Sequence, residues 1–349
     1  MLADKKGHPK ADGLFYFINQ IHLLLKSLHN NQQNNTRFGF IYSINLARSS
    51  KPTYIPDQLP STMILKPRII KRTFLSTILR ETCFSNDNRG GIMPELPDLQ
   101  VYSKNLMQLL KDKRLISVKV HSDKNANVDE KQLNDTLAGK KLNRVYRLGK
   151  QLYFEFAKEA ILALHLMLHG KLVYSKEDKP KYTLVALQFE HGETLAITDF
   201  QKMAHITLNP AKPEAIDALD AAIPQQLPIF AQGSKKAIKT LLMDQHIIGG
   251  IGNAYADEIL YEAGIAPQSV ANKIPKTILL KLAKTVDQVL SHAEKKIMKD
   301  HPDIISGEVR DFMKIHANKE KTDARGKAIL KEKIGGRMTY YTEDQKLFQ

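Results

Sequence analysis

Residues 248–267, IGGIGNAYADEILYEAGIAP, have the composition of a phosphate-binding turn. Three glycines at positions 249, 250 and 252 lie between two stretches with helical spacing, and glycine permits positive φ and close backbone approach. Asn253 is a favourable cap for the following helix, whose first turn carries N–H groups and partial positive charge that suit a phosphate oxygen. Three lysines on the expected preceding helix could add cationic contacts: Lys235, Lys236 and Lys239. An ordinary packing corner between two helices remains the alternative.

A second candidate is MPELPDLQ, at residues 93–100. Met93, Pro94 and Glu95 read like the start of a chain, although 92 residues precede them. The alternative is an internal turn that opens a helix, with proline in its first turn and Glu95 interacting favourably with the helix dipole.

The sequence patterns around these two stretches predict an α+β fold. A helical pattern over residues 98–112 is followed by strand-like segments, several of them alternating apolar and polar residues. We therefore expect a β-sandwich or barrel-like domain with an N-terminal helix over 93–210, a linker over 211–225 and a helical domain over 226–311. A β-hairpin is expected within 312–349.

Residues 1–92 do not have the pattern of a folded domain. They hold 13 Lys/Arg and 5 Asp/Glu, whereas residues 93–349 hold 39 and 32, a net charge of +7 that permits nucleic-acid binding. We interpret 1–92 as an extension that is disordered or not part of the functional protein; organelle targeting is an alternative. The single cysteine, Cys83, and the lack of a long apolar run favour a reducing, cytoplasmic setting without a membrane.

Together the two stretches resemble the formamidopyrimidine-DNA glycosylase / endonuclease VIII family, in the same order and at the same spacing. MPELPDLQ is similar to the family's amino terminus, and GIGNAYADEILYEAGIAP is similar to its helix-two-turn-helix signature. The resemblance covers about 93–349. It implies base-excision repair by a DNA glycosylase with abasic-site lyase activity, which removes oxidised bases from damaged DNA.

The resemblance also implies catalytic roles for three residues. Pro94 would be the nucleophile, through a secondary amine whose pKa of roughly 8 leaves a good fraction neutral. That role requires a chain that begins at Pro94, because a proline amide has no free lone pair. Glu95 would be the acid, and Lys150 would contact the phosphate next to the lesion. Asp98 occupies a position that is usually glutamate in the family.

Further residues are carried over to DNA contact and lesion recognition. Leu168, Gln201 and Met203 match positions that fill the space left by a flipped base, with core packing as the alternative for the two apolar ones. Arginine and phenylalanine are common at positions 201 and 203, so their absence leaves the preferred lesion and opposite base open. Residues predicted to contact DNA are Lys239, Gly252, Asn253, Tyr255 and Arg337.

The expected C-terminal hairpin resembles the family's zincless finger, because no cysteine follows position 83. His301 and His316 cannot form a tetrahedral site by themselves, so we predict no zinc and no other cofactor. The expected partner is damaged duplex DNA bound by a monomer. The alternative function is a non-catalytic nucleic-acid-binding protein that retains the two-turn motif.

Overall fold

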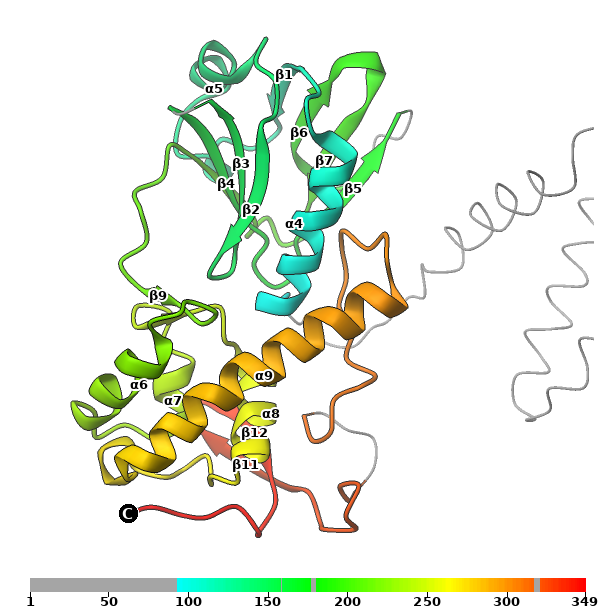
Figure 1. Ribbon diagram of the computed structural model, residues 1–349. Coiled ribbons are helices and arrows are strands. Elements are labelled where there is room, and N and C mark those ends of the chain that lie inside the picture. Colours follow the sequence, from blue (N-terminus) through cyan, green and yellow to red (C-terminus); the bar gives the residue numbers. More distant parts are fainter. Residues whose placement is uncertain (1–92, 158, 177–179, 317–320) are drawn as a thin grey trace, which may run out of the picture. The chain divides into compact units, whose positions relative to one another are not determined.

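The computed structural model describes residues 93–157, 159–176, 180–316 and 321–349. The predicted extension, 1–92, lies outside the described residues. The fold is the predicted α+β type (Figure 1). No helix within the described ranges is long and apolar enough to cross a membrane.

The first half of the described chain is a β-sandwich of two antiparallel sheets. One sheet has the strand order β1-β6-β7-β5 and the other β2-β3-β4-β8. The strands are β1 (Leu115–Val120), β2 (Arg144–Leu148), β3 (Gln151–Ala157), β4 (Ala160–His165), β5 (Lys171–Ser175), β6 (Thr183–Phe189), β7 (Thr194–Thr198) and β8 (His205–Leu208). Buried side chains of both sheets form one core, so the predicted sandwich is confirmed. The short helix α5 (Glu130–Leu137) and strand β8 were not predicted.

Helix α4 (Leu96–Leu110) connects this core to a second one. Leu99 and Tyr102 pack in the sandwich core, whereas Leu96 packs in the core of the helical half. The helix contacts both β2 and α9, and Figure 1 shows it running from the sandwich to the long helix α9. Pro94 and Glu95, which directly precede α4, are therefore held where the two cores meet.

The second half is helical. Its helices are α6 (Ile223–Gln232), α7 (Ile238–Leu242), α8 (Asn253–Ala263) and α9 (Lys276–Asp300). A two-stranded parallel sheet of β9 (Ile216–Asp217) and β10 (Ile248–Gly249) lies beside them, so β9 and the start of α6 fall within the predicted linker. Lys235 and Lys236 precede α7, so they do not lie on the helix that was expected to carry them.

The chain ends in an antiparallel hairpin of β11 (Leu330–Ile334) and β12 (Arg337–Tyr341). Gly335 and Gly336 form the turn and both have positive φ, which suits glycine. The hairpin packs on α8 through β12. This arrangement brings Arg337, at the start of β12, toward the beginning of α8.

Candidate active site

The Glu95 carboxylate caps helix α8. It accepts hydrogen bonds from the backbone N–H groups of Gly252 (2.7 Å), Ala254 (2.9 Å) and Tyr255 (3.3 Å). A helix N-terminus favours a negative group at this position. The predicted phosphate site on these amides is therefore corrected, because a carboxylate of the chain itself already occupies the donors.

Gly252 is required at this point by close packing. A Cβ atom there would lie 2.3 Å from Glu95 Cδ and 2.6 Å from Lys150 Nζ. Gly252 is accordingly the position where the carboxyl and the amine both approach the α8 backbone. Its contact with DNA stays a prediction.

Pro94 and Glu95 are both buried. The N–H of Glu95 donates to Asp98 Oδ2 (2.9 Å), which fixes the entry into α4. Asp98 in turn accepts two hydrogen bonds of 2.7 Å from the Arg310 guanidinium. Asp98 thus holds the partly buried Arg310 side chain against the first turn of α4.

Lys150 lies in the turn between β2 and β3. Gly149 has positive φ, and a Cβ atom there would lie 3.7 Å from the Gly249 backbone. The Arg147 guanidinium and the Gly149 N–H both bind the Asp217 carboxylate, which fastens this turn to the helical half. The Lys150 side chain is only 9 % exposed.

Burial lowers the pKa of Lys150, the nearby Glu95 carboxylate opposes this effect, and Arg337 and Arg310 lower it further. The Lys150 amine is therefore easier to deprotonate than an exposed lysine.

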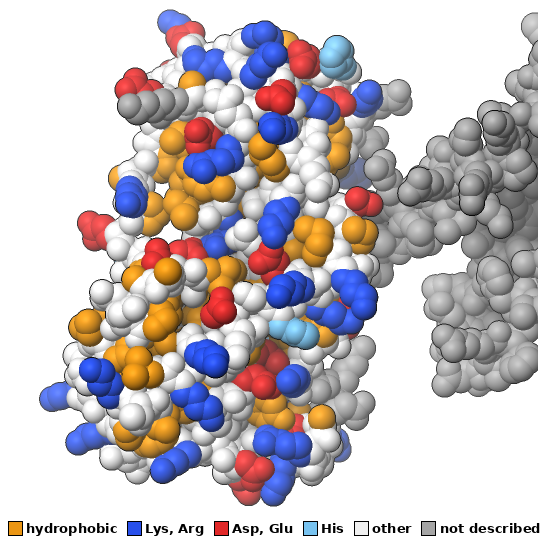
Figure 2. Space-filling model, viewed as in Figure 1, with side chains coloured by type: hydrophobic (Ala, Val, Ile, Leu, Met, Phe, Trp, Pro, Cys, Tyr) orange, Lys and Arg blue, Asp and Glu red, His pale blue; other side chains and the backbone are white. Residues whose placement is uncertain are grey.

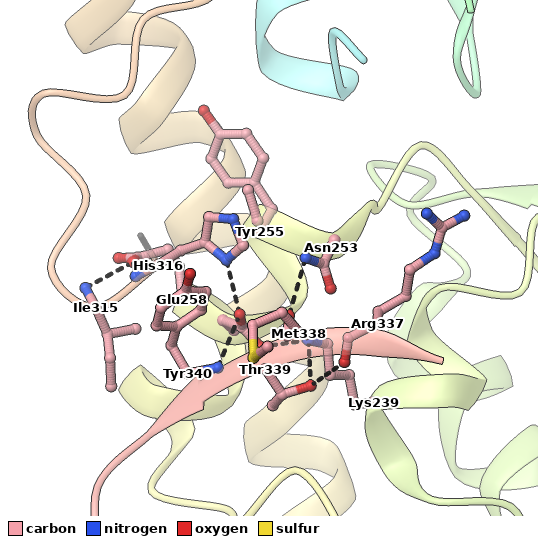
Figure 3. A network of polar contacts seen from close by, with 12 residues as sticks. Lys239, Asn253, Tyr255, Glu258, Ile315, His316, Arg337, Met338, Thr339 and Tyr340 are labelled. Carbon is pink, nitrogen blue, oxygen red and sulfur yellow. Dashed lines mark hydrogen bonds and ion pairs between the residues drawn. The ribbon is translucent and has the colours of Figure 1, made fainter. Parts of the chain in front are cut away.

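A buried polar network anchors the hairpin (Figure 3). Lys239 Nζ lies 2.7 Å from Asp257 Oδ1 and donates to Thr339 Oγ1 (2.7 Å). Asp257 Oδ2 lies 2.7 Å from His316 Nδ1 and accepts from the Tyr340 N–H (3.2 Å). Because Lys239 is completely buried, its predicted phosphate contact is replaced by a structural role.

Asn253 and Arg337 lie at the edge of this network (Figure 3). Asn253 Nδ2 donates to the Met338 carbonyl (3.1 Å), while the Arg337 side chain is exposed. Tyr255, by contrast, is 1 % exposed and lies under the Arg310 guanidinium, so its side chain is not available for the predicted DNA contact. Among the cations of this half that were predicted to contact phosphate, Arg337, Lys235 and Lys236 are exposed, whereas Lys239 is buried.

The predicted void-filling residues lie on two loops. Leu168 lies between β4 and β5 and is 38 % exposed, and Met203 lies between β7 and β8 and is 40 % exposed. Core packing does not account for either side chain. Gln201 lies on the second loop and is also exposed. The Asp199 carboxylate holds this loop by accepting backbone N–H groups, including those of Gln201 and Met203 (both 2.8 Å).

Sequence reasoning missed Phe200, which lies between the predicted positions on the second loop. Its ring is 58 % exposed and contacts the His169 ring at 4.6 Å between centroids, which joins the two loops. The motif DFQKMA contained this residue, but its apolar exposure has no periodic signal in the sequence.

Figure 2 shows basic side chains interspersed with acidic and apolar ones over the viewed face. On this face the net positive charge is spread rather than gathered in one patch. Positive charge around Lys150 comes from two individual residues, Arg310 and Arg337. Within the described residues, no cluster of three or more His, Cys, Asp or Glu side chains could hold a metal ion.

Comparison with known proteins identifies the family. The model for the formamidopyrimidine-DNA glycosylase N-terminal domain matches residues 93–206, and the model for the H2TH domain of the same glycosylase matches 216–300. The chain belongs to the formamidopyrimidine-DNA glycosylase family.

Curated relatives in this family include the formamidopyrimidine-DNA glycosylase of Mycoplasma pneumoniae. It is 32 % identical over 278 residues, which cover 72 % of this chain and 98 % of the relative. The enzyme of Streptococcus mutans is 27 % identical, covering 71 % and 97 %. Membership makes the chain a DNA glycosylase of DNA repair.

Solved structures show the same fold. A complex of the Lactococcus lactis Fpg with DNA containing an abasic site has a TM-score of 0.64 at 23 % identity, covering 71 % of this chain and 98 % of that one. A complex of the same enzyme with a FAPY-dG containing DNA has a TM-score of 0.63 at 24 % identity, with the same coverage. The likeness extends over both halves of the described chain.

Proposed function

We propose that this glycosylase is bifunctional, removing oxidised bases from duplex DNA and cleaving the strand through a Schiff base on the Pro94 amine. The observation that carries the proposal is the meeting of Pro94, Glu95 and Lys150 in one buried polar centre at the start of α8. A nucleophile, a carboxyl group and a cation within one site are the groups that this chemistry needs.

The reaction begins with the neutral secondary amine of Pro94. Its lone pair attacks C1′ of the damaged nucleoside, the C1′–N bond breaks, and the base leaves with the bonding electrons and a proton. Opening of the sugar ring then gives an iminium at C1′. The iminium acidifies the C2′ proton, whose loss expels the 3′ phosphate, and a second elimination expels the 5′ phosphate.

Glu95 is suited to proton transfer in this sequence. Its carboxylate is held by three backbone N–H groups, so its position relative to Pro94 is fixed without side-chain freedom. The Lys150 amine approaches the same glycine and can contact the phosphate beside the sugar. Arg337 and Asn253 supply further phosphate contacts at the α8 end of the hairpin.

Position 94 must be the first residue for this mechanism. In the full chain the Pro94 nitrogen forms an amide with Met93, and an amide nitrogen cannot attack C1′. We infer that the catalytic form begins at Pro94, acts as a monomer and contains no zinc. The hairpin of β11 and β12 would then serve as a zincless finger, held by the network around Asp257 in place of a metal.

Borohydride trapping on an abasic duplex tests the proposal. A chain that begins at Pro94 should form a covalent adduct, and the Pro94→Gly variant should lose most of it. The same fold acting only as a nucleic-acid-binding protein would bind the duplex without forming any adduct.

A further inference from the structure

The position of the Lys150 ammonium is not fixed by a hydrogen bond of its own within the described residues. Glu95 acts on it only through its charge. The ammonium nevertheless lies at the start of α8, since a Cβ atom on Gly252 would lie 2.6 Å from Lys150 Nζ. A lysine side chain has several rotatable bonds, so the place of its ammonium depends on where the backbone of its turn is held.

The carboxylate of Asp217 holds the turn that carries Lys150. Arg147 Nη2 donates to Asp217 Oδ1 (3.0 Å), and Arg147 Nη1 donates to Oδ2. The Gly149 N–H also donates to Oδ2 (2.8 Å), while the Gly149 carbonyl accepts from Arg147 Nη1 (3.1 Å). The carboxylate and the guanidinium together bind both polar groups of the Gly149 backbone, directly before Lys150 in the chain.

The pair of Arg147 and Asp217 is shielded from solvent. The two side chains are 4 % and 17 % exposed. The third nitrogen of the guanidinium, Arg147 Nε, donates to Gln100 Oε1 on α4 (2.9 Å). A two-point pairing of arginine with a carboxylate fixes direction as well as distance, so this pair restricts the turn more tightly than a single contact would.

Asp217 belongs to the helical half, whereas the turn belongs to the sandwich. It is the last residue of β9 and pairs with Gly249 of β10. A Cβ atom on Gly249 would lie 3.2 Å from the Cα atom of Gly149, so the two glycine backbones are in close contact. The chain reaches Gly252, at the start of α8, three residues after Gly249. Asp217 therefore fixes the Lys150 turn relative to the start of α8.

We propose that Asp217 is a positioning residue for Lys150. Its carboxylate holds the turn so that the Lys150 ammonium faces the phosphate beside the damaged sugar, and Asp217 acts only through the turn. Misplacing a catalytic group by about 1 Å can cost on the order of 100-fold in rate. This inference rests on the proposed function, since that function assigns the phosphate contact to Lys150.

A double-variant cycle on chains that begin at Pro94 tests the inference. Asp217→Asn keeps the shape of the side chain and one acceptor oxygen, but it cannot accept from the guanidinium at two points. The substitution is made in the native chain and in Lys150→Met, and cleavage of an abasic duplex is measured under single-turnover conditions. The matched control is Glu155→Gln, which removes the same charge from a more exposed pair with Arg144 on the same two strands.

We expect Asp217→Asn to slow cleavage at least fivefold in the native chain but less than twofold in Lys150→Met. A side chain that has been removed cannot be misplaced, so the two substitutions should not act independently. A residue that only supported the fold would slow both backgrounds by the same factor. Glu155→Gln should leave both rates unchanged.

The salt dependence of binding to the abasic duplex gives a second readout. Loss of one phosphate contact lowers the slope of log Kd against log salt concentration by about 0.9, which is the change expected for Lys150→Met. Asp217→Asn should lower the slope by at least half of that amount, although it removes a negative charge. Glu155→Gln removes the same charge and should not lower the slope.

Arg147→Lys breaks the same contact from the other side and keeps the net charge. A single ammonium cannot reproduce the two-point pairing, so this variant should show the same dependence on Lys150. It carries the test if Asp217→Asn does not fold.

Equal slowing in both backgrounds, or no slowing in the native chain, would overturn the inference. So would a Lys150→Met chain that cleaves at the native rate. A native chain that does not cleave the abasic duplex at all would instead contradict the proposed function, so the two failures are distinguishable.

Discussion

The ion pair between Lys239 and Asp257 gives the sharpest stability prediction. The two side chains are 1 % and 0 % exposed, and their charged atoms are 2.7 Å apart. The substitution Lys239→Met removes the cation while filling a similar volume. It leaves the Asp257 carboxylate buried, with only His316 and the Tyr340 N–H as partners.

Removing one partner of a buried ion pair destabilises a protein by about 3–5 kcal/mol, because the remaining charge stays in a medium of low polarity. For a domain of this size, each kcal/mol shifts the unfolding temperature by about 2–4 °C. We therefore expect Lys239→Met to lower the Tm by about 6–20 °C. The double variant Lys239→Met/Asp257→Leu should lose less stability, because no charge is then left buried alone.

Differential scanning calorimetry measures these shifts. The matched control is Lys236→Met, which removes a cation from a pair with Asp244 at 3.0 Å whose side chains are 55 % and 20 % exposed. An exposed pair contributes at most about 1 kcal/mol, so its Tm should fall by less than about 4 °C. If Lys239→Met shifted the Tm no more than Lys236→Met, the structural role assigned to the buried network would be refuted.

Three further predictions concern the site itself. Leu168→Ala and Met203→Ala should each reduce lesion excision in an activity assay. Because both side chains are exposed, the free energy of unfolding measured in urea should stay within about 0.5 kcal/mol of the native value. Lys150→Met should raise the free energy of unfolding at pH 7, because folding lowers the pKa of this lysine and its charged form therefore destabilises the folded state. The gain should shrink as the pH rises toward 10.5, and urea unfolding at several pH values measures it. Elemental analysis of the purified protein should find less than one zinc per chain, and a stoichiometric zinc would contradict the zincless hairpin.

The fold could largely be predicted from sequence because its strands alternate and its helices carry a clear period. β3, for example, begins at Gln151 as the strand-like QLYFEFA predicted. Helix α5 was missed because it is short and has only two buried residues, Leu133 and Leu137. Strand β8 is four residues long, too short for alternation to stand out.

The site could be predicted only in part. The pairing of Glu95 with the α8 amides joins residues about 160 positions apart, and no local pattern indicates it. Lys239 illustrates the same difficulty. A lysine near a glycine-rich turn predicts a phosphate contact, and the sequence does not show that its ammonium instead pairs with the buried Asp257. Burial depends on the fold of distant segments, so the pairing of Arg310 with Asp98 had no signal in the sequence.

The position of the covalent bond in the trapped complex tests the central claim most directly. After borohydride reduction of the abasic complex, peptide sequencing by mass spectrometry should find the sugar remnant on the nitrogen of Pro94, at the very start of its peptide. A remnant on the Lys150 amine, or on any chain that retains residues before Pro94, would contradict the account.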